Sequence, residues 1–254
     1  MTDFDIKDLV LSGVRWELTD APMSVNVNNA SAGKSAENTN VAGRTQTAIV
    51  PPIAPQQSVS VETATAMAAR PADIDALCRM ISEFNHPLRA GATNVVLPHI
   101  AKNPNGLVIV TDVPGGDDDL NGQILSGAAG ELMDKMLAAI GMSRMTVSFV
   151  PMVFWRTPGG RTPTRQELDL ARPFVNRVIE MLHPRFILTL GTLPAAEIAN
   201  ATLPRGHGMT VVLPNGVTAM PIFHPNYLML KPAAKRDAWN ALQIVQNLLK
   251  NTDK

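Results

Sequence analysis

The sequence has few of the features that mark a disulfide-linked, metal-clustered or membrane-spanning protein. It contains one cysteine among 254 residues, which excludes a disulfide framework and any self-contained site in which several cysteines bind zinc or an iron–sulfur cluster. The longest apolar runs, such as residues 147–155, are too short to cross a bilayer. The first residues, MTDFDIKDLV, are acidic and lack the basic region of a signal peptide. We therefore expect a cytoplasmic, soluble protein.

Aromatic residues are also few, and the net charge is zero. Aromatic side chains make up 4% of the chain, and 22 basic residues balance 22 acidic ones. The charges are unevenly distributed, because residues 1–143 hold 9 basic and 16 acidic side chains whereas residues 144–254 hold 13 and 6. A basic second part would suit a polyanionic partner, but the two parts would equally well compensate each other. Charge alone leaves both interpretations open.

The first 69 residues differ in composition from the rest. Residues 3–18 have the apolar spacing of a short amphipathic helix, so we assign an N-terminal helix to residues 1–20. Residues 21–69 are rich in Ser, Thr, Asn, Ala and Pro and contain no aromatic residue. Such a segment buries too little apolar surface to offset the entropy of ordering it, which predicts a flexible linker. The folded domain is then expected to span residues 70–254.

After residue 70, strand patterns alternate with helix patterns. Buried strands are predicted at 106–111, 146–155 and 185–190, a hairpin at 210–222 around Asn215-Gly216, and helices at 71–85, 127–140, 164–182 and 234–249. Thr164 and Glu167 form a capping box, and Pro173 is expected to kink the helix behind it. This order predicts a largely parallel sheet between helices, with a ligand site beyond the carboxyl ends of the strands.

Four loops would meet at that edge of the sheet. They hold Asp112 with Asp117–Asp119, Arg156 with Arg161, Gly191 with Thr192, and His224. Together these loops would supply carboxylates, arginines, backbone amides and a histidine. Each also has a purely structural interpretation: a solvated acidic loop instead of a metal site, a solvent-facing turn instead of a phosphate site, and an ordinary surface or core histidine. Spacing by itself therefore predicts a cleft without naming a reaction.

Three stretches narrow the choice when they are taken in order. They read ATNVVLPHIAKNPNGLVIVTDVPGGDDDLNGQILSGAAGELMDKMLAAIGMSR, WRTPGGRTPTRQELDLARPFVNRVIEMLHPRFILTLGT and FHPNYLMLKPAAKRDAW, with Pro204-Arg205-Gly206 before the last. Their order resembles that of the family 4 uracil-DNA glycosylases, in particular the alphaproteobacterial branch, over about 165 residues. The resemblance implies a three-layer α/β/α fold with a central four-stranded parallel sheet. It also implies base-excision repair, in which uracil is flipped out of DNA and its N-glycosidic bond is hydrolysed.

The resemblance assigns roles to individual residues. Asp112 stands where the family has the glutamate of its water-activating motif, and His224 stands where a histidine steadies the leaving uracil. Leu228 is expected to enter the duplex. The base pocket is expected to comprise Val113, Pro114, Gly115, Leu125 and Pro151, and the DNA contacts Arg156, Arg161, Arg205, Gly206, Asn226, Lys231 and Lys235.

The sequence departs from the family pattern at the base pocket. Pro151 replaces the asparagine that reads the uracil edge, and Leu125 replaces the aromatic residue that stacks on the base. Asp112 is one methylene shorter than the expected glutamate, and a displacement of about 1 Å can cost on the order of a hundredfold in rate. These changes predict weakened or altered activity.

The iron–sulfur cysteines of the family are also missing. Trp155 and Ala171 occupy two of their positions, and the region of His86 occupies a third. Cys78 does not fall on a ligand position, so we expect no cluster and no metal cofactor.

Two functions therefore remain open. The first is a DNA glycosylase that uses Asp112 and His224, and the second is a non-catalytic, DNA-binding relative of the same fold. A metal-dependent hydrolase built on Asp117–Asp119 has less support, because it would need a cation to hold the like charges together. For either of the first two we expect a monomer whose partner is DNA carrying a damaged base, with no membrane association.

Overall fold

The computed structural model describes residues 59–251. The helix predicted for residues 1–20 and most of the predicted linker lie outside the described residues. The end of that linker, however, is part of the folded domain, because Val61–Ala69 form helix α1. Ser60 caps this helix by accepting a hydrogen bond from the backbone N–H of Thr63. The predicted boundary at residue 69 is therefore wrong. The prediction relied on the lack of large apolar residues in this segment, whereas α1 packs through the small residues Ala64 and Ala68, both buried.

The sheet confirms the predicted fold class and adds one strand. Its order is β2-β1-β3-β5-β4, in which the first four strands are parallel and β4 pairs antiparallel with β5. The strands are β1 (Leu107–Thr111), β2 (Ser148–Pro151), β3 (Phe186–Leu190), β4 (Val211–Val212) and β5 (Thr218–Ile222). β4 and β5 form the hairpin predicted around Asn215-Gly216. β2 is shorter than predicted.

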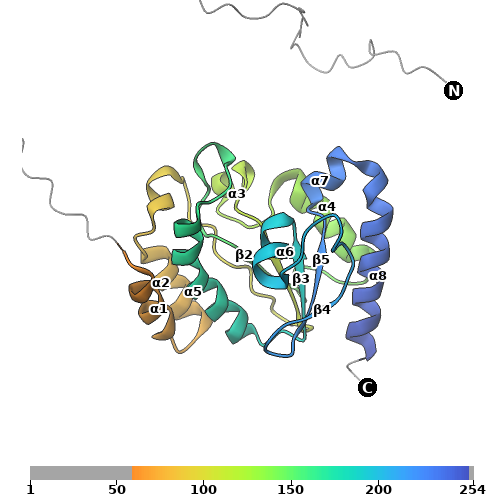
Figure 1. The fold of residues 1–254 in the computed structure, drawn as a ribbon, viewed down its shortest axis with the longest axis horizontal. Coiled ribbons are helices and arrows are strands. Elements are labelled where there is room, and N and C mark those ends of the chain that lie inside the picture. Colours follow the sequence, from red (N-terminus) through yellow and green to blue (C-terminus); the bar gives the residue numbers. More distant parts are fainter. Residues whose placement is uncertain (1–58, 252–254) are drawn as a thin grey trace, which may run out of the picture. The chain divides into compact units, whose positions relative to one another are not determined.

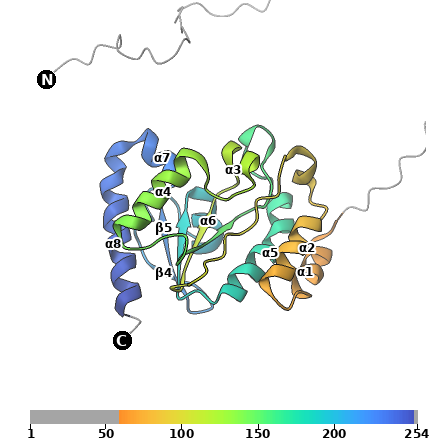
Figure 2. The same cartoon turned by 180° about the vertical axis from the view of Figure 1, so that it is seen from behind.

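Helices cover both faces of this sheet (Figures 1 and 2). On one face Val108, Val110 and Ile187 belong to a core shared with α2 (Ile74–Glu83), α5 (Arg165–Leu182) and α6 (Thr192–Ala199), with α1 packed against α5. On the other face Ile109 and Leu188 pack in a core with α4 (Gly127–Ala139) and α8 (Lys235–Asn251). The alternation of side chains along each strand thus divides the core into two layers.

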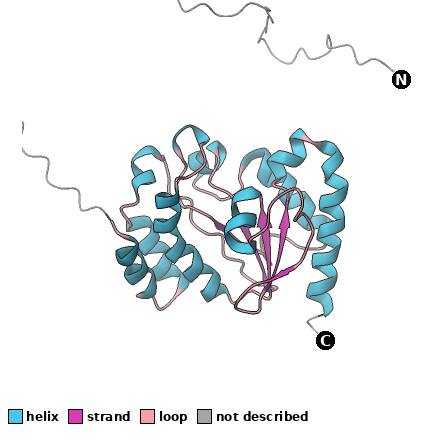
Figure 3. Cartoon of the chain, in the orientation of Figure 1, coloured by secondary structure: helices cyan, strands magenta, loops and turns pink. Residues whose placement is uncertain are grey.

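Several helices match their predicted positions, and two segments predicted to be loops also contain short helices. The capping box of Thr164 and Glu167 begins α5 as expected, and this helix continues through Pro173. The short helices α3 (Gly116–Asn121) and α7 (Pro225–Leu230) occupy segments expected to be loops (Figure 3). Neither these nor any other helix within residues 59–251 is long and apolar enough to cross a membrane.

The register of the sheet places four loops at one edge. Thr111 pairs with Pro151 and with Leu190, and Leu190 pairs with Ile222, so the last residues of the four parallel strands are neighbours. The residues that follow them, including Asp112, Gly191 and Phe223, must therefore emerge together. This edge carries the candidate site.

Candidate active site

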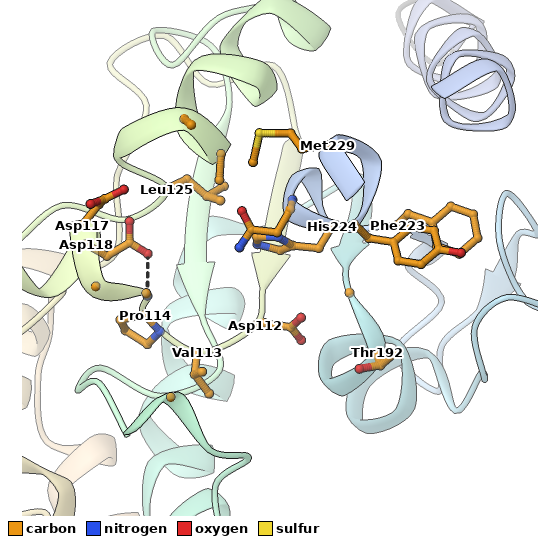
Figure 4. A pocket seen from close by; sticks show the side chains of 18 of the residues that line it. Asp112, Val113, Pro114, Asp117, Asp118, Leu125, Thr192, Phe223, His224 and Met229 are labelled. Carbon is orange, nitrogen blue, oxygen red and sulfur yellow. Dashed lines mark hydrogen bonds between the residues drawn. The ribbon is translucent and has the colours of Figure 1, made fainter. Parts of the chain in front are cut away.

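A cavity of about 650 Å³ lies at the carboxyl edge of the sheet (Figure 4). Its walls come from the segments that follow β1, β3 and β5, from the start of α4, and from Arg156 and Gly160 in the loop after β2. Asp112 and His224 are among its lining residues, as the sequence predicted. The other predicted residues on the lining are Val113, Pro114, Gly115, Leu125, Arg156 and Asn226.

Asp112 is one of the ionisable residues that line this cavity. Its Oδ1 accepts a hydrogen bond of 3.1 Å from the backbone N–H of Leu193, in the first turn of α6. Burial raises the pKa of the Asp112 carboxyl from 3.8 to about 6, and the hydrogen bond from Leu193 opposes that rise only in part. The group is therefore ionised at neutral pH while retaining the basicity that a general base needs.

Gly191 allows the carboxylate of Asp112 to approach α6 this closely. Its φ is +103°, a conformation that side chains disfavour, and a Cβ at this position would collide with the Asp112 carboxylate. The glycine at the start of α6 is therefore a requirement of the Asp112 site itself.

His224 lies at the start of α7 and presents a defined tautomer. The backbone N–H of Asn226 donates a 3.2 Å hydrogen bond to its Nδ1, so Nδ1 carries no proton and Nε2 carries one. Burial lowers the pKa of His224 to about 4, against the opposing charge of Asp118. The ring is therefore neutral at physiological pH, and its Nε2–H is a donor without a partner among the described residues.

The acidic loop is held by hydrogen bonds from backbone N–H groups and does not resemble a metal site. Asp118 accepts hydrogen bonds from the N–H groups of Gly115 and Ser126, and the buried Asp119 accepts two from Thr93 and Asn94. Within residues 59–251 no group of three or more His, Cys, Asp or Glu side chains is arranged to bind a metal ion. These carboxylates order the loop that shapes the cavity.

Leu125 forms one wall of the cavity and is fixed by an arginine. It has a φ of +51°, which is unusual for a leucine. Arg144 donates hydrogen bonds of 2.9 and 2.5 Å to the carbonyl oxygens of Ile124 and Leu125, and its guanidinium also lies over the ring of Phe149. These contacts hold the backbone of Leu125 in a defined position on the cavity wall.

The two arginines in the loop after β2, both predicted to contact DNA, have different environments. The guanidinium of Arg156 lies 3.7 Å from the position of a Cβ on Gly116 and has no hydrogen bond or ion pair with any described residue. Arg161 instead makes a bidentate ion pair with Glu167, at 2.6 and 2.8 Å, which lowers the pKa of Glu167 to about 2. Arg161 does not line the cavity, and its guanidinium is occupied in bracing the loop before α5.

Two predicted site residues lie in the core. Leu228 is fully buried beside Phe223 and Ala238, so the prediction that it enters the DNA duplex is wrong. Because α7 begins at Pro225, its helical turn directs Leu228 inward. Pro151 is buried at the end of β2 and is not on the lining of the cavity, so its predicted place in the base pocket is also wrong.

The remaining predicted DNA contacts do not line the cavity, although Arg205 and Lys231 directly follow the lining residues Pro204 and Leu230. Arg205 is exposed on the loop after α6, next to the half-buried Gly206. Lys231 is exposed directly after α7, and Lys235 is exposed as the first residue of α8. Sequence reasoning missed the most exposed apolar residue of this region, Leu230, which lines the cavity with 78% of its surface exposed. Its only signal was its place six residues after His224.

The iron–sulfur cluster that the resemblance implies does not fit this structure. The imidazole of His86 stacks on the indole of Trp155 with a centroid distance of 4.7 Å and an interplanar angle of 8°. Both rings and Ala171 are buried, and Phe84 and Phe174 pack beside them. Neither Trp nor Ala has a side chain that binds iron. Two packed rings and an alanine thus stand where the resemblance places cluster ligands, and they do not fit a cluster.

Comparison with known proteins agrees with this geometry. Residues 98–243, more than half of the chain, match the Uracil DNA glycosylase superfamily. The chain therefore belongs to the uracil-DNA glycosylase superfamily.

Within that superfamily the chain is similar to type-4 enzymes. It is 30% identical to the Type-4 uracil-DNA glycosylase of Archaeoglobus fulgidus over 154 residues, which cover 57% of this chain and 77% of the relative. It is also 30% identical to the Type-4 uracil-DNA glycosylase of Thermotoga maritima over 146 residues, covering 56% and 76%. The corresponding protein of Pyrobaculum aerophilum is 37% identical over 93 residues, covering 37% and 47%.

Proposed function

We propose that this protein is a DNA-repair glycosylase that hydrolyses the N-glycosidic bond of uracil or another deaminated base, with activity weaker or differently directed than in its type-4 relatives. One observation carries the proposal. A carboxylate with a raised pKa and a neutral histidine with a free Nε2–H line the same cavity, in a chain of the uracil-DNA glycosylase superfamily. We further place the chain in the branch that it resembles in sequence, the alphaproteobacterial one.

His224 would act on the leaving base. When the glycosidic bond breaks, negative charge grows on the base and positive charge grows on the sugar. A preorganised donor near the base oxygen stabilises that charge without reorganisation. Because Asn226 fixes the tautomer of His224, its Nε2–H is available for this purpose before the substrate arrives.

Asp112 would act at the sugar. Its ionised carboxylate stabilises the developing positive charge and accepts a proton from the attacking water. The low polarity that raises its pKa also strengthens both interactions. A cavity of low polarity would thus favour both the charge on the leaving base and the charge on the sugar.

The base preference is the part in which this chain would differ from its relatives. Pro151 offers no side-chain donor or acceptor and lies outside the cavity, so the edge of the base is not read from the end of β2. Leu125 contacts a base through apolar surface without a π-face. A cavity with these walls would discriminate less sharply among deaminated bases.

The test is a glycosylase assay with purified protein on single-stranded and duplex oligonucleotides that carry uracil, hypoxanthine or xanthine. Abasic sites and free base in equal amounts on at least one substrate would support the proposal. Binding of DNA whose affinity falls with salt, without release of any base, would support the alternative, a catalytically inactive DNA-binding relative. Absence of both would overturn the assignment of DNA as partner.

We propose Leu230 as the residue that fills the gap left by a flipped nucleotide, acting as an apolar wedge between base steps. Leu230→Ala should lower kcat/KM on duplex DNA by about tenfold, which corresponds to the loss of one large apolar contact. Single-stranded DNA needs no wedge and should be affected much less.

Leu120 is the matched control for this prediction. It is also an exposed leucine, with 69% of its surface accessible, but it lies on α3 and does not line the cavity. Leu120→Ala should leave kcat/KM unchanged on both duplex and single-stranded DNA. Equal losses on duplex and single strands for Leu230→Ala, or equal losses for the two variants, would contradict the role.

We propose that the protein works without an iron–sulfur cluster. The His86 ring stacks on Trp155 and hydrogen-bonds the carbonyl oxygen of Glu167. These contacts join the segment before β1 to the region of α5, and the resemblance places cluster ligands in both. Protein purified under anaerobic conditions should contain less than about 0.1 iron per chain and show no absorbance near 400 nm. Stoichiometric iron that resists a chelator would refute this proposal.

A further inference from the structure

We propose that His207, which lies outside the catalytic cavity, is a positioning residue that holds the His224 segment in place. This inference rests on the proposed function, because it concerns the residue assigned to the leaving base. It is carried by a ring stack and a hydrogen bond that join the loop after α6 to the residue before His224.

Phe223 is the link between the two histidines. Its ring is stacked on His207, with a centroid distance of 4.1 Å and an interplanar angle of 13°. It also contacts Tyr227, at 4.6 Å and 31°. Phe223 and Tyr227 line the cavity, whereas His207 does not. The three rings thus connect a wall of the cavity to a loop outside it.

The backbone is held as well as the ring. The N–H of Phe223 donates a 3.2 Å hydrogen bond to Nδ1 of His207. Burial lowers the pKa of His207, although Asp237 on α8 opposes this effect, so the ring stays neutral and Nδ1 remains an acceptor. Because Phe223 immediately precedes His224, a fixed amide and a fixed ring together define the direction in which the chain enters α7.

The loop that carries His207 is itself anchored. The N–H of Gly206 donates to the carbonyl of Thr202 at 2.8 Å, and the N–H of Gly208 donates to the carbonyl of Pro221 at 2.8 Å. The second bond joins the loop to β5, one residue before the end of the strand. His207 therefore has a rigid base from which to fix Phe223.

Phe223 has room to move if His207 is removed. A second cavity, of about 410 Å³, is lined by Phe223 together with His207 and by Asp237, Asn240 and Ile244 of α8. Deleting the imidazole would enlarge this space and remove the ring that stacks on Phe223. His224 would then lose its defined approach to the leaving base, and a displacement of about 1 Å is enough for a large loss of rate.

The test compares substitutions that remove one interaction at a time. His207→Phe keeps a ring to stack on Phe223 but no acceptor, and His207→Asn keeps an acceptor near the position of Nδ1 but no ring. His207→Ala removes both and should lower kcat by about 10- to 100-fold, with a much smaller change in KM for DNA. The Phe and Asn variants should each recover part of the loss.

His86 provides a matched control elsewhere in the fold. Its ring also stacks on an aromatic side chain, Trp155, and its Nδ1 also accepts a backbone N–H, from Leu88. His86→Ala should lower the melting temperature but keep kcat within about twofold. If His86→Ala lowers kcat as much as His207→Ala, or if His207→Ala keeps kcat within about twofold, His207 has no positioning role.

A second readout does not depend on activity. Amide hydrogen exchange at Phe223, measured by NMR, should become at least about tenfold faster in His207→Ala and remain unchanged in His86→Ala. Unchanged protection at Phe223 would overturn the inference even if kcat falls. If the wild-type protein releases no base, the proposed function fails, whereas the exchange measurement still decides whether His207 holds this segment.

Discussion

Replacing Asp112 with asparagine is expected to abolish measurable base excision and at the same time to stabilise the protein. Asparagine keeps an oxygen that accepts the hydrogen bond from Leu193 but loses the charge and the basicity of the carboxylate. Loss of a general base and of its electrostatic stabilisation should lower the single-turnover rate by on the order of 10²–10⁴-fold. DNA affinity should change little, because Asp112 is a half-buried residue of the cavity lining and not one of the exposed basic residues expected to contact phosphates.

The gain in stability follows from the raised pKa. In the folded protein the Asp112 pKa is about 6, above the 3.8 of an exposed carboxyl, so ionisation destabilises the fold. The stabilising effect of the protonated form is complete below about pH 4 and is lost as the pH rises through 6. At neutral pH the cost is roughly 2–3 kcal/mol after allowance for solvent screening.

Thermal melts across pH 4–8 test whether ionisation of Asp112 destabilises the folded protein. At pH 7.5 Asp112→Asn should melt several degrees above the wild type, and near pH 4 the two proteins should melt together. The same ionisation predicts an acid limb at about pH 6 in the rate of base release by the wild type. A melting temperature that is lower in the variant at pH 7.5 would mean that the carboxylate is not in a desolvated site.

Replacing His224 is expected to have the second largest effect on activity. His224→Ala removes the donor to the leaving base and should lower the single-turnover rate by on the order of 10²–10³-fold, the cost of losing one preorganised donor. His224→Gln keeps an amide donor of similar reach and should recover part of the rate. Because the pKa of His224 is about 4, its protonation should not contribute to the acid limb near pH 6.

His183 is a suitable control for the loss of a histidine. It is exposed at the end of α5 with a φ of +44°, a conformation that asparagine tolerates. His183→Asn should keep the wild-type rate. A full rate in His224→Ala, or an acid limb near pH 6 in the wild type that disappears in that variant, would contradict the assigned role.

Strand and helix patterns in the sequence were sufficient to predict the sheet and its functional edge. The buried runs before Asp112 and Gly191 are strands, and the hairpin at Asn215-Gly216 is the pairing of β4 with β5. Because parallel strands share one carboxyl edge, the segments containing Asp112 and His224 could be brought together without knowledge of the packing. The resemblance to known glycosylases added the roles of these residues.

The errors arose where the direction of a side chain depends on a short helix or on small residues. Leu228 lies three residues after Pro225, and a proline suggests a loop. Pro225 is, however, the first residue of α7, and the helical turn directs Leu228 into the core. The segment containing Ala64 looks like linker because its apolar residues are small, yet small residues are what let α1 lie against α5. Neither outcome follows from composition.

The roles of His207 and Arg144 had no signal in the sequence. Each makes contacts outside its own segment, since His207 stacks on Phe223, 16 residues away, and Arg144 binds the carbonyl of Leu125, 19 residues away. Such contacts depend on how loops from different strands pack at one edge of the sheet. These contacts can be identified only from the three-dimensional structure of that edge.

The release of free base from DNA under single-turnover conditions is the most direct test of the central claim, that the cavity of Asp112 and His224 cleaves N-glycosidic bonds. Wild-type protein in excess over a uracil-containing oligonucleotide at pH 7.5 should release uracil and form abasic sites in equal amounts. Asp112→Asn, folded and at least as stable, should release none within the same time. Equal rates for the two proteins, or release that depends on a divalent metal ion, would contradict the account.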